Sequence, residues 1–95
     1  MMDSKTRAKL RSIANTLQTE VLVGQSGITD NVLEQIKMNL TAHEIVKIGL
    51  LNNSDLKAKE LINELAQNLG AEPIQAIGNK MVIYKYSPKC KNHIL

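Results

Sequence analysis

Residues 21–33 read VLVGQSGITDNVL and decide how this chain folds. Val21–Val23 is too short and too apolar for an exposed helix, so it predicts a buried strand, which we begin at Glu20. The loop Gly24–Gly27 follows, and Thr29 then supplies the side-chain oxygen that is typical of a helix N-cap. A strand therefore passes through a glycine-bracketed loop directly into a helix.

Outward from this stretch, hydrophobic periodicity predicts the other elements. Helices are expected over residues 4–17, from the cap at Thr29 to about residue 42, and from a cap at Asn53 or Ser54 to the residue before Gly70. Strands are expected over residues 44–51, 73–77 and 81–86, with a two-residue hairpin turn at Gly78–Asn79. The order helix–strand–helix–strand–helix–strand–strand predicts a two-layer α/β sandwich with a four-stranded mixed sheet.

The composition is that of one small globular domain. The chain has 95 residues, and its hydrophobic content of 43% is too high for a disordered protein. Its apolar runs are much shorter than the roughly 20 residues of a membrane-spanning helix, and the first residues lack the apolar block of a secretory signal. The single cysteine, Cys90, fits a reducing compartment. We therefore expect one cytoplasmic domain over residues 1–95, with no membrane partner and with a short basic tail from about residue 87.

Charge is unevenly distributed along the chain. Residues 1–11 hold four basic side chains against Asp3, and residues 80–95 hold four lysines and no acid, whereas the segment between them carries twice as many acids as lysines. Basic clusters of this kind are typical of polyanion binding, although lysine-rich termini also serve solubility alone.

The usual signatures of catalysis are missing from the sequence. It contains neither a phosphate loop of the NTPase kind nor a Gly-x-Gly-x-x-Gly fingerprint. Cys90 and His93 lie in the tail, where nothing would orient a catalytic base, and two such ligands are too few for structural zinc. We expect no catalytic residue, no metal site, no cofactor and no small-molecule substrate.

The loop Gly24–Gly27 offers a binding chemistry instead. Glycine at both ends allows the backbone to approach a ligand closely, and the amides of the loop and of the first helical turn suit a phosphate. KH domains hold a nucleic-acid backbone with a loop of this pattern. A plain strand-to-helix turn is the alternative explanation of the two glycines.

Residues 21–33 also resemble the signature of the CRM-domain family in its free-standing bacterial YhbY form. Three further stretches resemble the same family in order and spacing, namely a basic opening helix at residues 7–14, the entry to the second strand at 43–48, and Gly70–Ala71 with the closing hairpin at 77–85. The resemblance runs from about Lys5 to Lys85. Many members carry a basic residue inside the loop, where this chain has Gln25 and Ser26.

The resemblance implies a fold similar to the C-terminal domain of translation initiation factor three. It also implies RNA binding and association with precursors of the large ribosomal subunit. The expected function is that of a non-enzymatic RNA-binding protein that binds ribosomal RNA or large-subunit precursors during ribosome assembly. The alternative, from a different class, is a protein-interaction adaptor that docks a ribosomal protein. An enzyme of a type that shows no known signature ranks third.

The residues expected to contact RNA fall into three groups. The first holds a backbone phosphate and consists of Gly24, Gln25, Ser26, Gly27 and the amides of Thr29 and Asp30. The second adds cations from the opening helix, namely Lys5, Arg7, Lys9 and Arg11, and the third adds Lys47, Lys80 and Lys85 from the strands. Of the two aromatic side chains in the sequence, Tyr84 and Tyr86, we expect at least Tyr84 to pack in the core.

Overall fold

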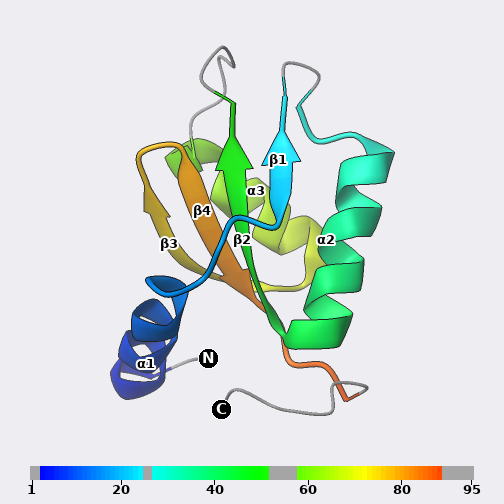
Figure 1. Cartoon of the computed structure of the whole chain (residues 1–95). Coiled ribbons are helices and arrows are strands. Elements are labelled where there is room, and N and C mark those ends of the chain that lie inside the picture. The colour runs from blue at the N-terminus through cyan, green and yellow to red at the C-terminus, as the bar shows by residue number, and fades with distance from the viewer. Residues whose placement is uncertain (1–2, 25–26, 52–57, 89–95) are drawn as a thin grey trace.

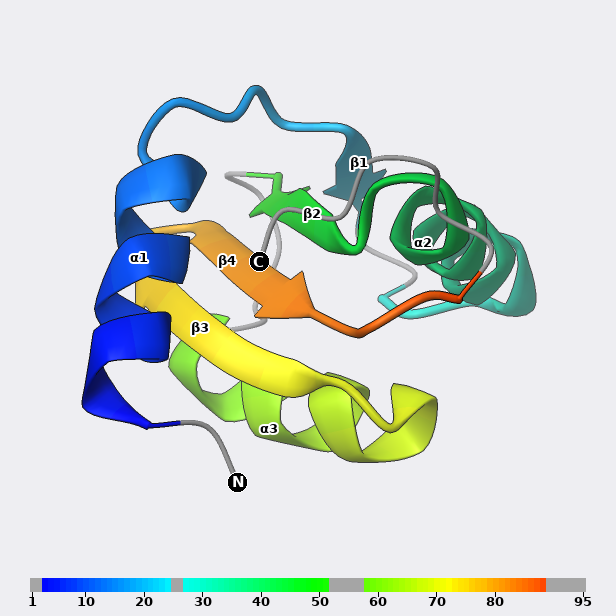
Figure 2. The same cartoon turned by 90° about the horizontal axis from the view of Figure 1, so that it is seen from below.

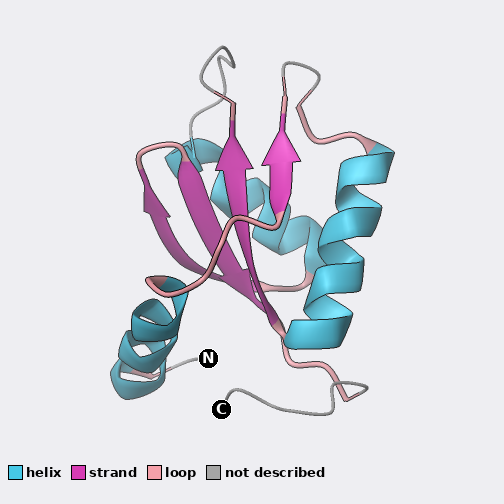
Figure 3. Cartoon of the chain, in the orientation of Figure 1, coloured by secondary structure: helices cyan, strands magenta, loops and turns pink. Residues whose placement is uncertain are grey.

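The computed structural model describes residues 3–24, 27–51 and 58–88, within which the elements follow one another in the predicted order (Figure 1, Figure 3). They are α1 (Ser4–Ala14), β1 (Val21–Val23), α2 (Asp30–His43), β2 (Ile45–Leu50), α3 (Ala58–Leu69), β3 (Glu72–Ile77) and β4 (Lys80–Tyr84). The predicted helix cap at Asn53 or Ser54 and the tail beyond Pro88, with Cys90 and His93, lie outside the described residues. Among the residues described, no helix has the length and apolar character needed to cross a bilayer.

The four strands form a mixed sheet, as predicted. Their order is β1-β2-β4-β3, with β1 parallel to β2 and the other two pairs antiparallel. β2 lies inside the sheet, which explains why almost every position in it is apolar. The hairpin between β3 and β4 turns at Gly78, whose φ of 60° belongs to the left-handed region that a Gly-first turn requires.

The two faces of the sheet are covered by different helices. Because strand side chains alternate, Ile48 and Ile83 point to the face on which α2 and α3 pack, whereas Val82 and Tyr84 point to the other face. On that second face they meet Leu10 and Ala14 of α1, so α1 and α3 lie on opposite sides of β3 and β4 (Figure 2). We call the side covered by α1 the α1 face and the opposite side the α2–α3 face. The prediction that Tyr84 packs in the core is confirmed.

α1 ends at Ala14, three residues earlier than predicted. The N–H groups of Thr16 and Leu17 donate to the carbonyls three residues before them, and the Thr16 hydroxyl also donates to the Ile13 carbonyl. These bonds tighten the chain out of the α-helical path, although Leu17 still packs against the α1 cluster. At the other end, Asp3 caps the helix, and hydrogen bonds from the side chain and backbone of Thr6 lower the pKa of the Asp3 carboxyl.

Glu44 accounts for the misplaced start of the second strand. Predicted as the first residue of a strand, it is instead the C-cap of α2, with a left-handed φ of 67° and a fully buried side chain. β2 therefore begins at Ile45, which pairs with Tyr84, and Glu72 of β3 pairs with Tyr84 from the other side. β4 ends there, so Tyr86 lies beyond the strand and not within it.

Candidate nucleic-acid interface

The glycine loop begins where β1 ends and closes as a turn. The Gly27 N–H donates to the Gly24 carbonyl at 3.0 Å, and Gly27 has a φ of 73°. A side chain at this φ is strained, which explains the glycine. A Cβ on Gly24 would meet only the Leu51 side chain, at an ordinary contact distance of 3.4 Å. Gln25 and Ser26, predicted to contact phosphate, lie outside the described residues.

Thr29 begins α2 as predicted. Its extended backbone leads into the helix, and its hydroxyl oxygen accepts a hydrogen bond from the Val32 N–H at 3.3 Å. The first amides of an α-helix have no acceptor within the helix, so the start of α2 carries partial positive charge beside the loop. The exposed Asp30 carboxylate in the first turn offsets part of this charge. The helix start supports anion binding only in combination with cations from elsewhere.

The tertiary structure places the ends of β1 and β2 and the β3–β4 hairpin at one edge of the sheet, which we call the loop edge. β1 and β2 are parallel, so both end there, and the Leu51 N–H donates to the Val23 carbonyl (Figure 1). The hairpin joins them, because Asn79 Nδ2 donates to the Leu50 carbonyl at 2.8 Å and the Leu50 N–H donates to the Asn79 carbonyl at 2.7 Å. The hairpin therefore lies beside the end of β2, close to the glycine loop.

A row of residues crosses the sheet next to this edge. The strand registers pair Leu22 with Gly49, Gly49 with Lys80, and Lys80 with Ile77. All four lie on the α1 face, beyond the part that α1 covers; Leu22 and Ile77 are 58% and 65% exposed, whereas Gly49 is buried. A Cβ on Gly49 would lie 2.9 Å from Lys80 Nζ, 3.0 Å from Thr19 Cγ2 and 3.2 Å from Leu22 Cδ2. The side chains of Lys80 and Leu22 thus converge above a residue that has no side chain of its own.

Lys47 is half-buried on the same face, two residues before Gly49 in β2 and so further from the loop edge. Its ammonium group donates to the Leu17 carbonyl at a long distance of 3.5 Å, in the segment that links α1 to β1. Lys47 is therefore positioned between the row at the loop edge and α1.

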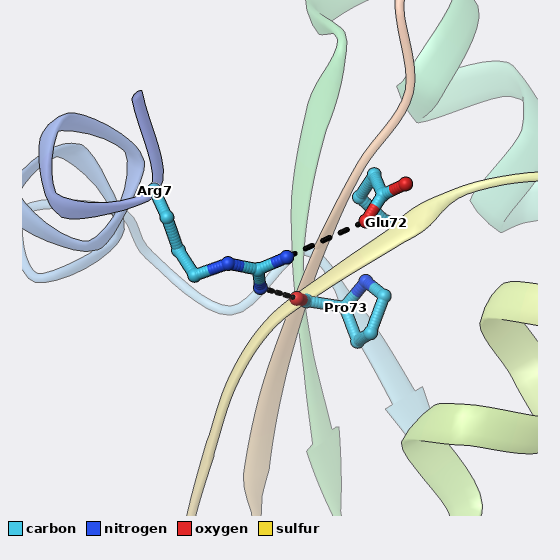
Figure 4. A network of polar contacts seen from close by, with 3 residues as sticks. All are labelled: Arg7, Glu72 and Pro73. Atoms are coloured by element: carbon cyan, nitrogen blue, oxygen red, sulfur yellow. Dashed lines mark hydrogen bonds and ion pairs between the residues drawn. The ribbon is translucent and has the colours of Figure 1, made fainter. Parts of the chain in front are cut away.

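The cations of α1 have different roles. Lys5, Lys9 and Arg11 are exposed, whereas Arg7 is engaged within the chain. The Arg7 guanidinium donates to the Pro73 carbonyl at 2.6 Å and approaches the Glu72 carboxylate at 3.5 Å (Figure 4). Both partners lie at the start of β3, at the edge opposite the glycine loop. Arg7 anchors α1 to the sheet, and an RNA contact by Arg7 stays a prediction.

Lys85 is also placed far from the loop. It follows the end of β4, and its backbone N–H donates to the Glu44 carbonyl at the edge opposite the loop edge. The structure therefore places Gly24, Gly27 and Thr29 between β1 and α2, and it places Lys80 at the same end of the sheet but on β4, with β2 in between. It keeps Lys85 and the whole of α1, with Lys5, Arg7, Lys9 and Arg11, toward the other end of the sheet (Figure 1).

Four exposed acids of the central segment lie on the other side of the molecule. Asp30 and Glu34 project from α2, and Glu60 and Glu64 project from α3, the two helices of the α2–α3 face. Lys5, Lys9, Arg11, Lys47 and Lys80 belong to the α1 face, together with the exposed acids Asp3 and Glu20 and the partly exposed Glu72, which is paired with Arg7. Folding thus converts a chain with basic ends and an acidic middle into a domain with one predominantly basic face.

Replacing Arg7 by methionine tests the anchoring of α1. The change leaves the Pro73 carbonyl without its charged donor, and we expect a loss of about 1 kcal/mol in the free energy of unfolding, measured by urea denaturation. Arg11→Met is the matched control on the exposed side of the same helix, with an expected effect below about 0.5 kcal/mol. Equal losses in the two variants would contradict the anchoring role.

Known proteins are similar to this chain over nearly its whole length. The family described as the CRS1 / YhbY (CRM) domain matches residues 2–85. The probable RNA-binding protein YqeI of Bacillus subtilis is 33% identical over 91 residues, which cover 96% of this chain and 95% of the relative. An RNA-binding protein of Haemophilus influenzae is 31% identical, with 95% and 91% covered.

A solved structure is similar over nearly the same range. The solution structure of a hypothetical protein from Staphylococcus aureus superposes with a TM-score of 0.77 at 33% sequence identity, and the match covers 92% of this chain and 91% of the other. The match in sequence and the match in fold therefore extend over almost the whole chain, and the family match at residues 2–85 includes the glycine loop and the closing hairpin. On this evidence, the chain belongs to the CRS1/YhbY (CRM) domain family.

Proposed function

We propose that this protein binds RNA on its α1 face and at its loop edge, without catalysing a reaction. The observation that carries the proposal is the separation of charge between the two faces of the sheet, because a polyanion requires cations that are not opposed by nearby carboxylates. The relatives named as RNA-binding proteins support it. The partner that we propose is ribosomal RNA, within a precursor of the large ribosomal subunit.

In the proposed complex two parts of the protein bind the RNA backbone, namely the glycine loop with the start of α2 and the cations of the α1 face. Gly24 and Gly27 let a phosphate approach the amides at the start of α2, and Lys80 and Lys47 neutralise the phosphates that follow across the α1 face. Lys5, Lys9 and Arg11 extend this surface along α1. Such contacts position a backbone and carry little sequence information, so the shape of the RNA would determine specificity.

Salt dependence tests the proposal. If the three exposed cations of α1 and the two half-buried lysines of the sheet each neutralise one phosphate, the logarithm of the association constant should fall against the logarithm of salt with a slope of about −3.5. Affinity for a single-stranded RNA, measured by fluorescence anisotropy, should then drop about a hundredfold between 50 and 200 mM salt. A slope shallower than about −1 would contradict binding through the basic face.

The second candidate function is docking of a ribosomal protein. The exposed apolar residues Leu22, Leu51 and Ile77 favour it, since all three lie at or beside the loop edge. Binding through these side chains would change little with salt and would be lost in a Leu22→Ser, Ile77→Ser variant. Crosslinking in cells, followed by sequencing of the attached RNA, distinguishes the two functions and identifies the RNA.

A further inference from the structure

A hollow of about 420 Å³ opens at the end of the sheet that lies opposite the glycine loop. Lys37 and Thr41 of α2, Asn68 of α3, and Lys85 and Tyr86 after β4 supply its polar lining. Leu40, Leu69 and Pro88 supply an apolar lining. The hollow is separate from the RNA surface proposed above, with which it shares only Lys85 among the residues predicted to contact RNA.

One wall of the hollow is fixed by a buried carboxylate. Residues 85–88 cross from the sheet to α2, and the Lys85 N–H donates to the Glu44 carbonyl at 2.8 Å. The Ser87 N–H donates to Glu44 Oε2 at 2.8 Å, and the Ser87 hydroxyl donates to the Thr41 carbonyl at 2.9 Å. Glu44 is fully buried in a left-handed conformation that a non-glycine residue adopts only where its surroundings hold it. The segment is therefore pinned to α2, so the hollow is pre-formed.

The size and lining of the hollow select a ligand class. Its volume lies within the range of small-molecule sites, about 300–1,000 Å³. Two ammonium groups favour an anion, the Tyr86 ring with Leu69 and Pro88 favours a flat apolar ring, and Asn68 and Thr41 offer hydrogen bonds to a polar edge. A nucleoside monophosphate combines a phosphate, a flat ring and a polar ring edge. We propose that this hollow binds a nucleoside monophosphate unit, either free or as one residue of an RNA.

The negative ends of two helices lie near the hollow, but their carbonyls are largely occupied. The Thr41 carbonyl accepts from the Ser87 hydroxyl, and the carbonyls of Ala66 and Gln67 accept from the N–H groups of Ala71 and Gly70. The Lys37 ammonium is 3.6 Å from the Glu34 carboxylate, an exposed pair that contributes little and can rearrange. The lysine charges are therefore available to a phosphate.

The test is a titration of the full chain with each of the four nucleoside 5′-monophosphates, followed by amide chemical shifts. We expect saturable shifts around residues 37–41, 68–69 and 85–87, and weaker binding of inorganic phosphate and of the nucleosides. Lys37→Met and Lys85→Met should each raise the dissociation constant about fivefold, because each removes one charged contact to the phosphate. Lys59→Met, the same change on an exposed part of α3, should leave the dissociation constant within about twofold of its value in the unmodified chain.

Four outcomes would overturn the proposal. The first two are a lack of saturable chemical-shift changes up to about 10 mM nucleotide and changes that are confined to the α1 face. The third is a loss of affinity in Lys59→Met equal to that in Lys37→Met and Lys85→Met. The fourth is binding of inorganic phosphate as tight as that of the nucleotides. Circular dichroism of each variant separates a lost contact from a lost fold.

Measuring RNA binding by the same two lysine variants identifies the source of the nucleotide. If Lys37→Met and Lys85→Met weaken RNA binding as well, the unit belongs to the RNA. If they abolish only mononucleotide binding, the ligand is a free nucleotide. Both outcomes support the hollow as a site. Charge reversal at Lys5 and Lys9 tests the RNA surface separately, so a failure of one proposal is distinguishable from a failure of the other.

Discussion

Reversing the charge of Lys5 and Lys9 to glutamate is expected to weaken RNA binding by about a hundredfold near 0.1 M salt, to a similar extent for RNAs of unrelated sequence. The two side chains stand four residues apart on α1 and are exposed, so the change removes two phosphate contacts and adds repulsion. The slope of the salt dependence should become shallower by about 1.5. Anisotropy titrations over a range of salt concentrations measure both quantities.

A control variant shows whether RNA binding depends on the position of the reversed charges or only on the net charge of the protein. Gln35→Glu, Lys59→Glu and Gln67→Glu together change the net charge by the same amount on exposed positions of α2 and α3. This triple variant should lose less than about fivefold in affinity, because its new carboxylates lie on the α2–α3 face, away from the proposed surface. Equal losses in the two variants would mean that net charge alone drives association. An unchanged affinity in the Lys5, Lys9 variant would remove α1 from the interface.

Gly24→Ala and Gly27→Ala should differ in how far they lower the thermal stability, because the two glycines differ in backbone conformation. Gly27 has a φ of 73°, so a Cβ there costs about 1–2 kcal/mol and should lower Tm by roughly 5–15 °C in addition to weakening RNA binding. At Gly24 a Cβ makes only an ordinary contact with Leu51, so Tm should fall by no more than a few degrees. RNA affinity should nevertheless fall about tenfold, since the added methyl group obstructs the approach of the RNA backbone.

Gly24→Ala is therefore the decisive variant of the pair. Thermal unfolding and RNA titration of the same preparation separate the two effects. If Gly24→Ala retains full RNA affinity, or if its affinity falls only as far as its stability predicts, the glycines serve the strand-to-helix turn alone. The phosphate would then have to be held elsewhere on the α1 face.

The element order could be predicted because the signals that define it are local. Thr29 caps α2 with its own side chain, Gly78 adopts the φ that a two-residue turn requires, and apolar spacing marks one side of each helix. The strand boundaries that failed depend on distant partners. β4 stops at Tyr84 because β2 and β3 both begin opposite it, and the local pattern of residues 81–86 carries no information about where the neighbouring strands begin.

The candidate site could be predicted only in part, for the same reason. The glycine loop and the cationic ends are visible in the sequence, and the resemblance to the CRM family points to RNA. The engagement of Arg7 with Pro73 and Glu72 joins residues more than 60 positions apart, and no periodicity in α1 distinguishes Arg7 from Arg11. Glu44 looks like a strand residue until its carboxylate is seen to accept from Ser87.

By itself, the sequence determined the helices, the strands, the glycine loop and the capped start of α2, since each of these depends on side chains within a few residues of one another. The tertiary structure alone decided that α1 packs on the face opposite α2 and α3, and thereby which charges share a side. The physical reason is that an apolar stripe specifies that a helix must be buried but not which surface buries it. That choice depends on packing against strands far away in the chain, and it makes one face of this domain basic.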